Sequence, residues 1–377
     1  DYSTFNALLA ESDAELLVGE RITTDTGDLT LTADADGSGD LTDQLTLNDS
    51  PILTSAGDIT LNGSSSSAVG IWSERQIDMI AAGTITINDD FWGTFKSFLD
   101  ADDGIVINGN FGSGGGIFLN GNANGIVDGN DTITLAAGIT LDTSFGGGII
   151  SLSDTQALGA ITLLAGDSLN LDGDFSSFGA TTFSVGTSGG AVGLFSVASG
   201  ATLDTNGNTF SVSAIDIDLQ GNIDVGSGSA TISSDARIGL GDATCGSCVM
   251  SISGAELQNI TAGTLTIDST ADAIFVDNIT AANSDNIGTV ILNSGKHTLF
   301  QNNASTFNAL TVNAKNDAYV YVDLTTDTGD MILNADTDSS GGAQGLFIRF
   351  APTMTSAGDI ALSASSNGNG IDVNGSV

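Results

Sequence analysis

Apolar and polar residues alternate along most of this chain in short runs. Examples are Leu-Thr-Leu at 29–31, Ile-Thr-Leu at 59–61 and Ile-Thr-Ile at 85–87. A period of two is that of a β-strand with one buried face. Clusters of Gly, Asn, Asp and Ser separate the runs, and these residues favour turns. The pattern predicts an all-β chain, and the best helix candidate is the single stretch 7–15.

A glycine stands just before many of these strands. Gly27, Gly57, Gly83, Gly104 and Gly138 are separated by 30, 26, 21 and 34 residues. Short strands that return at this spacing predict a parallel β-helix (β-solenoid) with irregular coils of about 20–30 residues and loop insertions. An antiparallel sandwich array is the alternative. The glycine rhythm at coil length and the presence of only 2 Pro favour the β-helix.

The chain also repeats itself at long range. The segment Ser-Thr-Phe-Asn-Ala-Leu at 3–8 returns at 305–310, and Thr-Ser-Ala-Gly-Asp-Ile at 54–59 returns at 355–360. We therefore predict one unit over residues 1–302 and the start of the next over residues 303–377, in one continuous solenoid. Such a chain is expected to be a segment of a tandem array.

Short segments like Gly-Asp-Ile-Thr-Leu at 57–61, in which a glycine precedes an alternating strand, recur along the chain. In this it resembles the filamentous-haemagglutinin-like and autotransporter-like giant repetitive surface proteins of bacteria. The resemblance implies a β-solenoid in which such phrases mark successive coils. It also implies an extracellular or cell-surface location.

The charge is strongly negative, with 46 Asp and Glu against 7 Lys and Arg, a formal charge of -39. This argues against binding to nucleic acid, whose phosphates require Lys and Arg, and against docking on anionic membranes. No apolar run is long enough for a transmembrane helix, so we expect no membrane insertion of this segment.

Two acidic or amide-rich turns are candidate calcium sites. Asp34, Asp36, Ser38 and Asp40 have the spacing of the first half of an EF-hand loop, but Leu45 stands where the bidentate Glu belongs, so Asp43 would have to assist. The second copy keeps Asp336 and Asp338 and replaces Asp40 by Gly342. The other turn offers the oxygen-bearing side chains Asn120, Asn122, Asn124, Asp128 and Asp131. Solvated turns without calcium are the alternative; bound calcium would relieve the repulsion among the carboxylates.

The two cysteines are Cys245 and Cys248, and the second pair that a structural zinc site would need is absent. We interpret them as a local disulfide in an exported protein. The only histidine, His297, is interpreted as a surface residue, because no second His and no nucleophile motif accompany it. We therefore expect no catalytic residues and no enzyme. The basic residues are scattered singly: Arg21, Arg75, Lys96, Arg237, Lys296, Lys315 and Arg349.

The aromatic cluster between Phe91 and Leu99 interrupts the pattern and is expected to be an inserted loop, packed on the solenoid or forming a contact patch. Together these features predict an extracellular structural protein, a solenoid segment of a surface fibre or adhesin stalk. Its expected partner is itself, by covalent continuation or end-to-end stacking. The alternatives are a module that binds glycans or cell surfaces through residues 89–103, and a carbohydrate-active β-helix enzyme.

Overall fold

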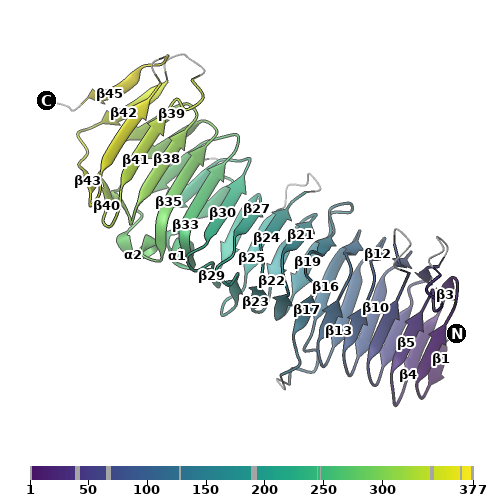
Figure 1. Cartoon of the computed structure of the whole chain (residues 1–377). Helices are drawn as coiled ribbons and strands as arrows, with labels where there is room; N and C mark the ends of the chain where they lie inside the picture. The colour runs from purple at the N-terminus through teal and green to yellow at the C-terminus, as the bar shows by residue number, and fades with distance from the viewer. Residues whose placement is uncertain are drawn as a thin grey trace. The chain divides into compact units, whose positions relative to one another are not determined.

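The computed structural model describes residues 2–38, 43–64, 69–126, 129–187, 193–243, 245–246, 248–339, 344–365 and 367–374. The chain divides into two compact units, residues 1–204 and 205–377, and each is described by itself. In both, stacked parallel strands predominate (Figure 1). The predicted parallel β-helix is therefore confirmed. No helix among the described residues is long and apolar enough to cross a membrane.

In the first unit each strand pairs with the strand three places later, so that one coil contains three strands and the unit has three stacks. The first stack consists of β1 (Tyr2–Phe5), β4 (Arg21–Thr24), β7 (Ile52–Ser55), β10 (Ile77–Ala81), β13 (Ser97–Ala101), β16 (Gly116–Asn120), β19 (Ile149–Leu152), β22 (Leu169–Leu171) and β25 (Leu194–Val197). The second consists of β2 (Leu8–Glu11), β5 (Leu29–Thr32), β8 (Ile59–Asn62), β11 (Ile85–Ile87), β14 (Ile105–Ile107), β17 (Ile133–Leu135), β20 (Thr155–Ala157), β23 (Phe175–Ser177) and β26 (Thr202–Asp204). The third consists of β3 (Leu16–Val18), β6 (Leu45–Leu47), β9 (Ile71–Ser73), β12 (Phe91–Gly93), β15 (Phe111–Ser113), β18 (Thr140–Asp142), β21 (Ile161–Ala165) and β24 (Thr181–Val185).

Strand register shows how the glycine rhythm relates to the coils. The strands that follow Gly27, Gly57, Gly83 and Gly104 are β5, β8, β11 and β14, which are consecutive members of the second stack. Gly138 instead precedes β18, a strand of the third stack. The spacing of the first four glycines therefore measures coil length directly, whereas the fifth interval mixes two stacks.

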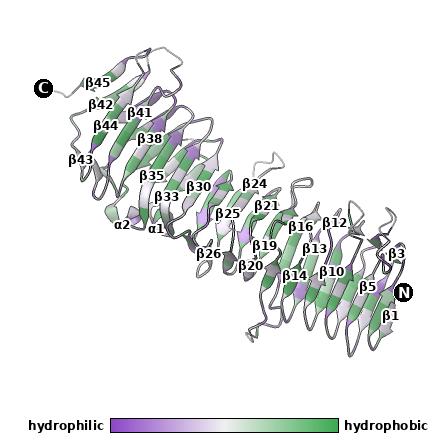
Figure 2. Cartoon of the chain, viewed as in Figure 1, coloured by the Kyte–Doolittle hydropathy of each residue, from purple (hydrophilic) through white to green (hydrophobic). Residues whose placement is uncertain are grey.

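Apolar side chains of successive coils lie above one another inside the first unit. Ile59, Ile85 and Ile105 form one such column, and each is fully buried. Figure 2 shows the resulting alternation of apolar and polar positions along the strands. Each buried Ile, Leu or Phe side chain contributes roughly 1.5–3 kcal/mol, so a coil gains stability only when its neighbours cover it.

The best helix candidate and the expected inserted loop are both built from strands in this unit. Residues 7–15 do not form a helix, because Leu8–Glu11 pairs as strand β2 with β5, and Leu8 and Ala10 alternate with the exposed Leu9. The aromatic segment is not an inserted loop either. Its strands β12 and β13 belong to regular coils, with Phe91 and Leu99 in the interior. In both segments the pairing with neighbouring coils decides the structure, because a short apolar run is compatible with a helix or a strand when it is considered alone.

The second unit has two long stacks, a shorter third one and two short helices. One stack consists of β27 (Phe210–Ser213), β30 (Ser229–Ser234), β33 (Ile260–Ser269), β35 (Ile287–Ser294), β38 (Leu310–Ala314), β41 (Met331–Ala335) and β44 (Ile360–Ala364), with β29 (Asn222–Asp224) paired to the start of β33. Another consists of β32 (Met250–Ile252), β31 (Ile238–Gly241), β34 (Ile274–Asp277), β36 (His297–Phe300), β39 (Asp317–Val320), β42 (Gly345–Arg349) and β45 (Gly370–Asn374). The third consists of β37 (Ser305–Phe307), β40 (Leu324–Thr326) and β43 (Met354–Ser356). The remaining elements are β28 (Asp216–Leu219), α1 (Gly254–Gln258) and α2 (Ala281–Ser284).

The long-range sequence repeat has a structural counterpart. Strands β1 to β9 correspond in order to β37 to β45, and one pair of hydroxyl groups makes the same contact in both copies. Thr24 Oγ1 lies 2.9 Å from Ser55 Oγ in the first copy, and Thr326 Oγ1 lies 2.8 Å from Ser356 Oγ in the second. The boundary predicted at residues 302 and 303 falls between β36 and β37, inside the second unit.

Amide side chains stack between coils on the outside of both units. In the first unit Asn88 donates to Asn62 at 2.7 Å, and Asn108 donates to Asn88 at 2.8 Å. In the second, Asn313 and Asn334 form the same ladder. Such ladders hold neighbouring coils in register, because each amide both donates and accepts.

Candidate functional site

The turn that follows β5 in the first copy and β41 in the second is built in the same way. Asp34 and Asp336 begin it with positive φ values of 56° and 50°. The carbonyl of Asp34 accepts from Gly37 N, and the carbonyl of Asp336 accepts from Ser339 N, both at 3.2 Å. A left-handed conformation is uncommon for Asp, so its occurrence in both copies indicates a turn held by its surroundings.

Asp336 is the more deeply buried of the two aspartates. It is only 1% exposed, and neither of its carboxylate oxygens has a hydrogen-bond partner among the described residues. Its Oδ2 lies 2.9 Å from the point where a Cβ on Gly368 would stand, and the carbonyl oxygen of Gln344 lies beside the same point. The Asp336 and Gln344 oxygens therefore lie close to Gly368 on the same side, where any Cβ would overlap them.

In the first copy the equivalent turn meets two further side chains. Asp34 Oδ2 accepts from Ser64 Oγ at 2.8 Å, while its Oδ1 is buried with no hydrogen-bond partner in the described part of the chain. Asp89 Oδ2 accepts from the adjacent Gly63 N at 2.9 Å. Burial raises the pKa of Asp89 above its usual range, and the negative charges of Asp90 and Asp34 add to this effect.

Sequence reasoning did not include Ser64 and Asp89 in this site. They lie 30 and 55 positions after Asp34. A usable signal exists, because each follows the first residue of its strand, Leu29, Ile59 or Ile85, by four or five positions. In stacked coils, equal distances from the strand start place side chains at the same corner.

The other members of the predicted loop have separate positions. Asp36 Oδ1 accepts from Ser38 N at 2.9 Å, and this bond lowers the pKa of the Asp36 carboxyl. Asp40 lies outside the described residues. Asp43 is buried, and Leu45 is a fully buried residue of β6. The arrangement of this corner is therefore one of stacked turns from neighbouring coils.

The second predicted loop uses two of its side-chain oxygens within the turn, whereas Asn122 Oδ1 is buried with no hydrogen-bond partner in the described part of the chain. Asn120 Oδ1 accepts from Asn122 N at 3.2 Å, and Asn124 Oδ1 accepts from Ile126 N at 2.7 Å. Asp131 is buried, and Asp128 lies outside the described residues. Nowhere in the described ranges do three or more His, Cys, Asp or Glu side chains form a metal-binding group.

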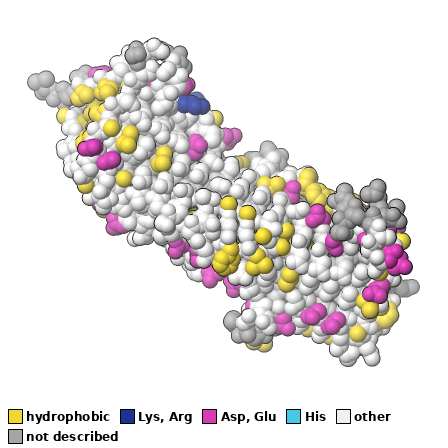
Figure 3. Space-filling view, viewed as in Figure 1, with side chains coloured by type: hydrophobic (Ala, Val, Ile, Leu, Met, Phe, Trp, Pro, Cys, Tyr) yellow, Lys and Arg dark blue, Asp and Glu magenta, His cyan; other side chains and the backbone are white. Residues whose placement is uncertain are grey.

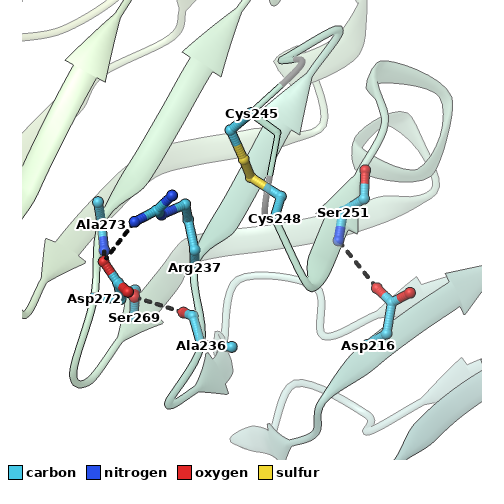
Figure 4. The surroundings of a disulfide bond; sticks show 9 residues. All are labelled: Asp216, Ala236, Arg237, Cys245, Cys248, Ser251, Ser269, Asp272 and Ala273. Carbon is cyan, nitrogen blue, oxygen red and sulfur yellow. Dashed lines mark hydrogen bonds and ion pairs between the residues drawn. A yellow bond between two sulfur atoms is a disulfide. The ribbon is translucent and has the colours of Figure 1, made fainter.

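The two cysteines form a disulfide in the loop between β31 and β32 (Figure 4). Their Cα atoms are 5.4 Å apart, within the usual range, and Cys248 N donates to Cys245 O at 3.0 Å. The bridge packs against Gly239, where a Cβ would stand 3.1 Å from Cys248 Sγ. Nearby, Arg237 lies 3.5 Å from Asp272 and Asp216 accepts from Ser251 N.

His297 lies at the outer surface of the second unit. Its Nδ1 is 2.9 Å from Asp317 Oδ2, and Asp317 Oδ1 accepts from Gly345 N. The neighbouring ring of Tyr319 stacks on Phe347 at 5.1 Å. Burial and the Asp317 charge raise the pKa of Tyr319 to about 12. This cluster links three consecutive coils on one face, which suits a role in holding their register.

The first coil of the chain exposes side chains that the second copy covers. Phe5 is 38% exposed, whereas its counterpart Phe307 is fully buried. In the second copy, Thr306 N donates to Ile279 O at 2.7 Å, and Asn308 Nδ2 donates to Ile287 O at 2.9 Å. The coil formed by residues 274–302 therefore covers in the second copy the face that is open in the first.

Acidic side chains are spread over the visible face of each unit (Figure 3). A shallow hollow on the first unit lies beside Trp92, with Asp90, Asn110 and Asp142 in its wall. The indole of Trp92 lies over Gly112, where a Cβ would overlap the ring. Comparison of the chain with protein-family models, with curated proteins and with solved structures finds no match.

The raised pKa of Asp89 predicts that the stability of the fold depends on pH, and EDTA is present in the measurement to remove divalent ions. The protonated form of Asp89 is favoured by folding, so this contribution to stability is present below the unfolded pKa of about 4 and is lost as the pH rises through the folded pKa. Asp89→Asn keeps an oxygen for Gly63 N and removes the charge. We expect the variant to melt at a higher temperature than the parent at pH 7 and at the same temperature at pH 3.

The exposed Asp25→Asn is the control for this change, because it removes one charge without removing a buried one. Thermal melting monitored by tryptophan fluorescence is suitable, since both tryptophans, Trp72 and Trp92, lie in the first unit. A lower melting temperature for Asp89→Asn than for the parent at pH 7 would contradict the prediction.

Proposed function

We propose that this chain is a structural segment of an extracellular tandem-repeat β-solenoid that forms a surface fibre or adhesin stalk. The observation that carries the proposal is that the second copy stacks directly on the coil before it: Phe307 is fully buried, and Thr306 N donates to Ile279 O at 2.7 Å. Coils that match in this way allow units to continue one another without interruption.

Mechanical stability would follow from the stacked coils. Each coil is held to its neighbours by backbone ladders, interior columns and asparagine ladders. Both units are therefore stabilised along the stacking direction by many repeated contacts. The charge of -39 keeps such material soluble and opposes contact between neighbouring fibres. The disulfide is consistent with an oxidising, extracellular compartment.

A lengthened chain tests the proposal. One additional copy of residues 1–302 is placed directly before residue 1 of the full chain. At about 25 residues per coil and about 4.8 Å per coil, we expect electron microscopy to show a rod longer by about 60 Å. Hydrogen exchange at the original residues 8–11 should be slower in the lengthened chain than in the parent, because residues 274–302 of the added copy now cover them.

The matched control carries a flexible Gly/Ser linker of about 20 residues at the same junction. It has the same units, but its junction is not constrained to continue the stack. A variable angle between two separate particles in the directly joined chain, as in the control, would overturn the fibre proposal.

Glycan binding is the second candidate function, and the hollow beside Trp92 favours it. An aromatic ring next to carboxylate and amide groups is suited to sugar rings, which combine an apolar face with hydroxyl groups. The same fibre could carry this contact on its side. A glycan-array screen of the parent against Trp92→Ala distinguishes such binding from a purely structural role.

A further inference from the structure

The carboxylate of Asp336 is buried, and none of its described neighbours compensates its negative charge or donates a hydrogen bond to it. The carboxylate is 1% exposed and has no hydrogen-bond partner among them. Arg237 and Lys296 lie near Asp272, Lys315 acts on Asp268, and Arg349 pairs with Asp372. None of the ion pairs between described residues includes Asp336. An ionised carboxylate in such surroundings costs several kcal/mol unless a positive charge or a set of donors compensates it.

A backbone carbonyl oxygen accompanies this carboxylate at Gly368. Asp336 Oδ2 and the carbonyl oxygen of Gln344 both lie within 3 Å of the position that a Cβ on Gly368 would take. A Cβ at residue 368 would overlap the Gln344 carbonyl oxygen, so glycine allows both oxygens to lie close to the same backbone atom. The Gln344 oxygen also accepts from Asn369 N at 2.6 Å. Carboxylate and carbonyl oxygens are the ligands that calcium prefers, usually completed by water.

The first copy supports the same assignment independently. Asp34 has the same left-handed turn and a buried oxygen with no hydrogen-bond partner in the described ranges. Asp89 supplies a second carboxylate at this corner: its Oδ2 accepts from Gly63 N, and the adjacent Ser64 donates to Asp34 Oδ2. Two carboxylates that repel each other at one corner are stabilised by a shared divalent cation.

We propose that the turn after β5 and the turn after β41 each bind one calcium ion, with Asp34 and Asp336 as their central ligands. Asp89 completes the site of the first copy, and the Gln344 carbonyl contributes to the site of the second. The ion bridges turns of neighbouring coils, so it reinforces the stack at one corner. The proposal does not depend on fibre formation.

Calcium titration of the full chain by isothermal calorimetry, in 150 mM NaCl after removal of divalent ions, tests this assignment. We expect two saturable equivalents with dissociation constants of roughly 0.1–1 mM, as in extracellular calcium modules. Asp336→Asn should lose one equivalent, and Asp34→Asn should lose the other. Calcium should raise the melting temperature of the parent but not that of the double variant.

The repeat provides matched controls, because Asp25 and Asp327 occupy equivalent exposed turns in the two copies. Asp25→Asn and Asp327→Asn change the net charge equally and should keep both equivalents. If they reduce binding as much as the site variants do, calcium is only a diffuse counterion and the proposal fails. Unchanged titration of Asp336→Asn and Asp34→Asn overturns it too. Far-UV circular dichroism verifies folding, and if one site variant misfolds, the other still decides.

Discussion

Phe111→Ala is expected to destabilise the first unit by about 3–5 kcal/mol. Phe111 is fully buried in β15, and its ring stacks on Phe91 at a centroid distance of 4.3 Å. Removing the ring leaves a cavity between two coils. The neighbouring coils cannot close it, because their backbones remain linked by parallel ladders on both sides.

Urea denaturation followed by tryptophan fluorescence measures this effect, since Trp92 lies next to Phe91 in the same strand. Phe178→Ala is the matched control. Phe178 is 53% exposed in the same unit, so its removal should change the free energy of unfolding by less than about 0.5 kcal/mol. Equal midpoints for the two variants would show that the Phe91–Phe111 stack does not stabilise the core as described.

Gly146→Ala is expected to cost about 1–3 kcal/mol or more, although it adds a single methyl group. A Cβ at Gly146 would overlap the carbonyl oxygen of Gly114 in the preceding coil. Gly114 N in turn donates to Gly93 O at 2.9 Å, so the carbonyl belongs to a backbone that is itself held in place. The added methyl must push two coils apart at this corner.

Gly19→Ala is the control for this substitution, because no atom lies within 4 Å of its Cβ position. Neither glycine has a positive φ, so the comparison isolates the close approach of the backbone from conformational strain. The same fluorescence-monitored denaturation applies. The prediction is wrong if Gly146→Ala unfolds at the same urea concentration as Gly19→Ala.

Some residues of the proposed calcium sites could be identified from the sequence and others could not. Asp34 and Asp336 were singled out by turn composition and by their equivalence in the repeat. Ser64 and Asp89 were missed, because an EF-hand pattern searches within one loop, whereas this corner is assembled from turns of neighbouring coils. Burial of Asp336 is likewise invisible in a sequence that presents it as one more acidic turn.

The helices illustrate a similar limit. Ser253 and Glu256 form a capping box that begins α1, a local signal present in the sequence. The helix has five residues and is followed at once by the ten-residue strand β33, so the strand pattern of its surroundings conceals it. It also contacts the second short helix, α2.

The sequence by itself determined the class of fold. Alternation specifies which face of each strand is buried, and glycines at coil spacing specify where the chain turns, since both are local physical preferences. Only the tertiary structure decided which turns lie above one another. Register between coils depends on fitting three stacks at once, so Asp34 meets Ser64 and Asp89 through packing of the whole coil, which no short stretch of sequence encodes.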